Sequence, residues 1–159
     1  MPVFFARRES DIPQPKVFIF APADTESHKE LEDAGCLLAL GSANWSNPTG
    51  DTTDKLAEMA SSADALAGTS IKGARISREV LRASEGLRIV AKYTVGVDEI
   101  DVDAATELGI LVTHAPTEAN WGGVAETTVT KLLTLLKNTR ERDRHMKSGG
   151  EWRDVSLTG

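Results

Sequence analysis

Cysteine, aromatic residues and long apolar segments are all scarce in this sequence of 159 residues. The one cysteine, Cys36, rules out a disulfide within a single chain, and the N-terminus lacks the apolar region of a signal peptide, so a cytosolic location is expected. Cys36 lies in a short apolar run, which favours a buried hydrophobic role over a nucleophilic one. No run approaches the ~20 apolar residues that span a bilayer, so a membrane partner is not expected.

Basic residues are in deficit as well. The sequence has 18 Lys and Arg against 24 Asp and Glu, a formal net charge of -6, and no basic stripe, so nucleic acid is not expected as a partner. An anionic ligand remains possible because a few local donors outweigh net charge at short range. The 3 histidines have no acidic or cysteine partners at ligand spacing, so no metal site is predicted.

Short apolar runs alternate with helix-forming segments through the first two thirds of the chain. The predicted strands are 17–21, 36–40, 63–67, 87–91 and 110–113. The predicted helices are a segment ending at Gly35 and residues 51–61, 77–84 and 102–108. Strands joined through helices form crossovers in a parallel sheet. We therefore predict an α/β, flavodoxin-like fold: a parallel five-stranded sheet with helices on both faces.

The pattern changes after Pro116. Strand signals stop, and apolar residues recur at helical spacing through residues 120–147, which predicts one long protruding helix or two helices. Residues 137–144 are heavily charged, which is typical of a solvated surface and also suits an arm that lies on a partner.

A glycine-containing loop, residues 93–98 (YTVGVD), follows the fourth predicted strand. Ligands of open α/β sheets bind beyond the carboxyl ends of the strands, where this loop and residues 68–71 are expected to lie. Gly96 would let backbone N–H groups turn toward a small anion. Alternatively, Gly96 only permits a tight turn.

Residues 87–116 read LRIVAKYTVGVDEIDVDAATELGILVTHAP, and this segment resembles the D-isomer-specific 2-hydroxyacid dehydrogenases, a family of NAD(P)-dependent enzymes. The likeness continues through residues 120–126 (NWGGVAE) and 149–152 (GGEW). The resemblance is specific over about residues 62–153. Before residue 62 it extends only to the order of predicted strands and helices.

The resemblance implies a substrate site and part of a cofactor site. The main-chain amides of Thr94, Val95 and Gly96 would bind the substrate carboxylate, Asn120 would approach the substrate, and Val124 would pack on the nicotinamide. Asn120 could instead be the N-cap of the long helix. The implied substrate-binding residues are Thr69, Ser70, Thr94, Val95, Gly96 and Asn120, with no catalytic residue and no metal ligand among them. Thr69 stands where many phosphoglycerate-oxidising relatives have arginine, so phosphoglycerate is not the predicted substrate.

The resemblance also implies two domains, a substrate-binding domain at 1–116 and a truncated start of the cofactor-binding domain at 117–159. The family's arginine, acidic residue and acid–base histidine would all lie beyond residue 159, and no G-x-G-x-x-G motif for pyrophosphate occurs. We therefore expect the chain alone to bind neither NAD nor NADP tightly and to have no turnover. The expected partners are a small 2-hydroxy or 2-oxo acid and a second copy bound through residues 120–147.

Two other functions remain open. The chain could be a standalone regulatory module that binds a small carboxylate or dimerises without catalysis. It could also be another flavodoxin-type domain that shares only the topology, because a fold alone does not assign a function.

Overall fold

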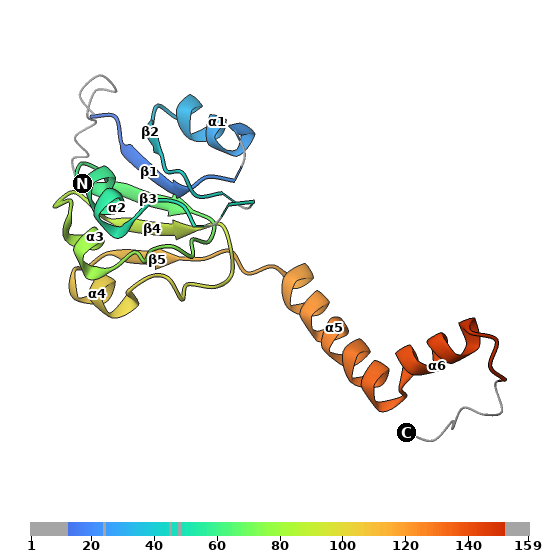
Figure 1. Ribbon diagram of the computed structural model, residues 1–159. Helices are drawn as coiled ribbons and strands as arrows, with labels where there is room; N and C mark the ends of the chain where they lie inside the picture. The colour runs from blue at the N-terminus through green and yellow to red at the C-terminus, as the bar shows by residue number, and fades with distance from the viewer. Residues whose placement is uncertain (1–12, 24, 45, 48, 152–159) are drawn as a thin grey trace, which may run out of the picture. The chain divides into compact units, whose positions relative to one another are not determined.

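The computed structural model describes residues 13–23, 25–44, 46–47 and 49–151 (Figure 1). The chain divides between Ala115 and Pro116 into two compact units, which are described separately here.

The first unit is built on one parallel sheet in the order β2-β1-β3-β4-β5. Its strands are β1 (Lys16–Ala21), β2 (Leu37–Leu40), β3 (Ala65–Gly68), β4 (Ile89–Lys92) and β5 (Leu111–Thr113). This order is that of flavodoxin-like folds, so the predicted fold class is confirmed. The third and fourth strands begin two residues later than predicted. Ala63 and Leu87, the first residues of the predicted strands, are buried in the core but belong to no strand, so their apolar character reflects burial alone.

Helices cover the two faces of the sheet unequally. The helices of this unit are α1 (Thr25–Asp33), α2 (Thr53–Ala60), α3 (Arg78–Arg82) and α4 (Val102–Glu107). In this strand order, the connection from β1 to β2 leads toward one edge of the sheet, whereas the connections from β2 to β3, from β3 to β4 and from β4 to β5 lead toward the other edge. Right-handed crossovers therefore place α1 on one face and the other helices on the opposite face. Figure 1 shows α2, α3 and α4 grouped together, with α1 apart from them.

Two apolar clusters fill the space between the sheet and its helices. The larger one includes Phe18 and Phe20 of β1 with buried residues of α2, α3 and α4, and the smaller one joins Val17 and Ile19 of β1 to Leu31 of α1. The alternation of residues along β1 between the two clusters follows from the two-residue period of a strand. Both faces of this central strand are thus buried, as its continuous apolar run predicts.

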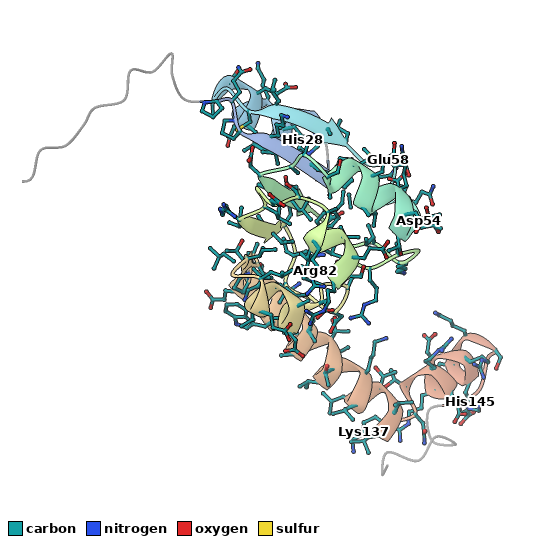
Figure 2. All side chains as sticks on the ribbon, turned by 90° about the vertical axis from the view of Figure 1, so that its left-hand side faces the viewer. His28, Asp54, Glu58, Arg82, Lys137 and His145 are labelled. Atoms are coloured by element: carbon teal, nitrogen blue, oxygen red, sulfur yellow. The ribbon has the colours of Figure 1, made fainter. Side chains whose placement is uncertain are left out.

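The described part of the second unit, residues 116–151, contains two helices, α5 (Glu118–Leu136) and α6 (Thr139–Lys147). The helical segment predicted at 120–147 is therefore two helices, because Asn138 adopts a left-handed conformation with φ 47° between them. Asparagine tolerates this conformation better than most residues. Neither helix contains a buried residue. Figure 2 shows Lys137 at the junction and His145 near the end of α6. Of the helices described, none is both long and apolar enough to cross a membrane.

Candidate functional site

Two loops meet at the carboxyl edge of the sheet. Residues 69–77 follow β3 and residues 93–101 follow β4, and these strands are hydrogen-bonded neighbours. The N–H of Tyr93 donates to the carbonyl of Gly68 at 2.9 Å and extends the pairing to the start of both loops. The topology thus brings together five predicted site residues: Thr69, Ser70, Thr94, Val95 and Gly96.

The second loop turns its carbonyl groups toward the protein. The Thr94 carbonyl accepts from the Ala115 N–H at 3.1 Å, and the Val95 carbonyl accepts from His114 Nδ1 at 2.9 Å. In a trans peptide a carbonyl and the following N–H point in opposite directions. The N–H groups of Val95 and Gly96 therefore point away from Ala115 and His114. Among the residues that the structure describes, neither N–H has a hydrogen-bond acceptor.

A side-chain donor accompanies these two amides. Thr94 Oγ1 is buried and has no hydrogen-bond partner in the described part of the chain. Buried polar groups are normally paired, so this hydroxyl is an exception among the described residues. The donors that the loop offers to a ligand are therefore its two backbone N–H groups, a type of donor that binds small anions.

The backbone of Gly96 bears on the choice between a turn and an anion site. Gly96 is not among the residues with positive φ, and a Cβ atom there would meet Asp98 Oδ2 at 3.3 Å. A left-handed turn is therefore not the reason for a glycine at this position. Two physical roles remain for a glycine here: the close contact with the Asp98 side chain and the approach of a ligand to the exposed backbone.

The two loops are tied to each other along their length. Arg75 donates to the carbonyl of Asp98 at 3.1 Å, and Ile76 pairs with Ile100 in an isolated parallel bridge. The N–H of Ile76 donates to the carbonyl of Glu99 at 2.9 Å. A displacement of one loop should therefore shift the other loop as well.

A buried ion pair lies beneath both loops. The side chain of Lys92, at the end of β4, has 0% of its surface exposed and is paired with Glu99, whose side chain is 11% exposed. Lys92 Nζ also donates to the carbonyl of Thr69 at 2.5 Å and lies 5.8 Å from the centre of the Phe20 ring. Sequence reasoning missed this pair, although a lysine that ends an apolar strand run was a visible signal.

Thr69 and Ser70 have different surroundings. Thr69 is buried, and both its N–H and its Oγ1 donate to the carbonyl of Ala21 in β1, at 2.8 Å and 3.2 Å. Its hydroxyl is thus engaged within the sheet. Ser70 is half-buried, and its Oγ lies 3.5 Å from Lys92 Nζ. Contact of either residue with a ligand stays a prediction.

Asn120 and Val124 lie on α5, in the second unit. The N-cap of α5 is Thr117, so the alternative prediction that Asn120 caps this helix is wrong. The side chains of both residues are exposed, Val124 to 62%. With Ala119, Gly123 and other α5 residues they line a shallow, open hollow. Their predicted roles toward substrate and nicotinamide are not tested by this geometry.

Tyr93 is the first residue of the loop after β4, and its side chain is half-buried. Burial raises the pKa of its phenol, which keeps the hydroxyl protonated at neutral pH. No cluster of His, Cys, Asp or Glu that could hold a metal occurs among the described residues.

Comparison with known proteins places this geometry in a family. Residues 17–149 match the model of the D-isomer specific 2-hydroxyacid dehydrogenase catalytic domain. D-3-phosphoglycerate dehydrogenase of Methanocaldococcus jannaschii is 34% identical over 137 residues, which cover 86% of this chain and 24% of that protein. Glyoxylate reductase of Pyrococcus horikoshii is 32% identical over 140 residues, covering 88% of this chain and 39% of that protein.

Solved structures show the same fold. The PH0520 protein of Pyrococcus horikoshii matches with a TM-score of 0.71 and 22% identity over 92% of this chain and 43% of its own. A glyoxylate reductase from Paecilomyes thermophila matches with a TM-score of 0.67 and 18% identity over 93% of this chain and 46% of its own. The chain spans less than half the length of each of these relatives. Through the match over residues 17–149, the chain belongs to the D-isomer specific 2-hydroxyacid dehydrogenase family.

Proposed function

We propose that this chain supplies the substrate-side part of an NAD(P)-dependent D-2-hydroxyacid dehydrogenase, which interconverts a 2-hydroxy acid and a 2-oxo acid. The observation that carries the proposal is a pair of N–H groups, those of Val95 and Gly96, which have no acceptor among the described residues. The carbonyls of Thr94 and Val95 in the same peptide groups are already bonded to the protein. Charge-assisted hydrogen bonds from these amides would hold the substrate carboxylate.

A small acid without a phosphate group is the substrate class that we favour. The relatives are named for phosphoglycerate and for glyoxylate. The resemblance implies that Thr69 stands where many phosphoglycerate-oxidising relatives have arginine, and its hydroxyl is bonded to Ala21. The ammonium group of Lys92 is buried and paired with Glu99. Neither residue therefore offers a free cation to a phosphate.

The residues present fit only one end of a nicotinamide cofactor. Val124, exposed on α5, would pack on the nicotinamide, and Asn120 would approach the substrate beside it. The sequence contains no glycine-rich turn for the pyrophosphate. When bound in an intact enzyme, NAD or NADP would accept or donate the hydride. We also propose that the chain divides at 116/117 into a substrate-binding part and the start of a cofactor-binding part. The chain alone is expected to hold neither NAD nor NADP tightly.

A homodimer in the cytosol is the proposed setting. The second unit exposes a run of large apolar side chains, which in water favours association. These are Trp121, Val124, Val129, Leu132, Leu133, Leu135 and Leu136. The proposed interface is residues 120–147, and the cytosolic location rests on the single cysteine.

A titration followed by amide NMR tests the proposed site. Glyoxylate added to the ¹⁵N-labelled chain should shift the amide signals of Val95 and Gly96 in a saturable way, and 3-phosphoglycerate should bind more weakly. In Gly96→Val the new side chain should cover the amides and weaken binding at least tenfold. Lys16→Ala, which removes an exposed charge at the start of β1, at the opposite edge of the sheet, is the matched control and should bind normally. Saturable shifts confined to other residues, or none, would refute the site.

A further inference from the structure

We propose that the buried Lys92–Glu99 pair is a positioning device, which fixes the two loops so that the amides of Val95 and Gly96 keep the geometry an anion requires. This inference rests on the proposed function. Lys92 is the last residue of β4, and Glu99 lies near the end of the loop that follows it, so the pair closes that loop upon itself.

The bonding of Lys92 shows that it acts through other residues. An ammonium group has three N–H donors. They meet three protein acceptors: the carbonyl of Thr69 at 2.5 Å, Ser70 Oγ at 3.5 Å and the carboxylate of Glu99. Since the side chain is 0% exposed and its donors are used, Lys92 has none left for a substrate. It is a positioning residue and makes no contact with the reacting molecule.

The pair connects the two loops of the candidate site in the first unit. Through Thr69 and Ser70, Lys92 holds the start of the loop after β3. Through Glu99 it holds the loop after β4, whose Glu99 carbonyl also accepts from the N–H of Ile76. The Ser70 oxygen accepts from Lys92, which leaves the hydroxyl hydrogen of Ser70 available to a ligand. Loss of the pair would remove its ties to both loops at once, and the bonds of Arg75 and Ile76 to the loop after β4 would remain.

The pair also sets the electrostatics of the site. Glu99 cancels the charge of Lys92, so the anion would be held by backbone dipoles and hydroxyl groups in place of a direct ion pair. A buried pair contributes little net stability compared with apolar side chains of similar size, whereas removal of one partner leaves a costly unpaired charge. Stability and positioning can therefore be separated by experiment.

Three variants separate them. Lys92→Met and Glu99→Gln alone should each lower the melting temperature sharply, because a buried group loses its partner. The double variant K92M/E99M should recover most of that loss, and still bind glyoxylate at least tenfold more weakly than the unchanged chain. Lys55→Met with Glu58→Met, at an exposed pair, is the matched control and should change neither measurement.

The possible outcomes each decide a separate claim. A stable K92M/E99M chain that binds glyoxylate normally would overturn the positioning role. If the unchanged chain binds no glyoxylate, the proposed function fails, while hydrogen exchange at residues 93–99 still tests positioning: exchange should accelerate in the double variant, and unchanged exchange would refute it. If K92M/E99M does not fold, Glu99→Asp serves instead. It keeps the charge but shortens the reach, so it should weaken binding or accelerate exchange with little change in melting temperature.

Discussion

The two units of this chain differ in where their apolar side chains lie. In the first unit, Phe18, Phe20 and their neighbours are fully enclosed between the sheet and its helices. In the second, α5 and α6 carry large apolar side chains and bury none of them. Because helices in proteins draw most of their stability from packing of an apolar face, only the first unit carries its own source of stability. The second unit should depend on what covers its apolar side chains.

Separating the units should produce the largest effect. A peptide of residues 116–159 should lose most of its helical circular dichroism at low micromolar concentration, since isolated helices of this length are marginal in water. A chain ending at Ala115 should unfold in urea with a single cooperative transition. A peptide whose helicity stays high and does not depend on concentration would remove the contrast between the units.

A pair of truncations measures the same contrast one side chain at a time. Phe20→Ala should cost about 3–5 kcal/mol of unfolding free energy, because Phe20 is 0% exposed and its loss opens a cavity. Leu135→Ala, at a residue that is 73% exposed in the single chain, should change it by less than about 0.5 kcal/mol at protein concentrations too low for the proposed dimer to form. Urea denaturation of both variants provides the comparison. Similar costs at the two positions would show that Leu135 is covered in solution.

The sequence predicted what depends on local pattern and missed what depends on contacts between distant segments. The short apolar runs were enough for the parallel sheet, and the glycine-containing loop after β4 was enough to locate the candidate anion site. The break at Asn138 was left open, because helical periodicity continues across it. The Lys92–Glu99 pair was missed, since a charged residue after an apolar run is usually exposed and only the folded loop brings its partner near.

The apolar face of the second unit supplies the next test. Leu132 and Leu133 are 54% and 53% exposed, and replacing both with Asp should weaken self-association at least tenfold by placing charges in the interface. Sedimentation at tens of micromolar should show a dimer for the unchanged chain and a monomer for the variant. The first unit should keep its melting temperature. A monomer in both cases would contradict the proposed dimer.

The smallest effect is expected at an exposed ion pair of the first unit. The guanidinium of Arg78 lies 2.5 Å from Glu107 and lowers the pKa of that carboxyl below its ordinary 4.5, by hydrogen bonding first and by charge second. A carboxyl with a lowered pKa stabilises the fold above its ordinary value, and this contribution is lost as the pH falls through the folded-state value. Both side chains face solvent, which screens the pair. Glu107→Gln should therefore leave the melting temperature at pH 7 almost unchanged. Below pH 4.5 the melting temperature of the unchanged chain should fall, and that of the variant should fall only slightly less. A loss as large as that expected for Glu99→Gln would mean that burial is not what separates the two ion pairs.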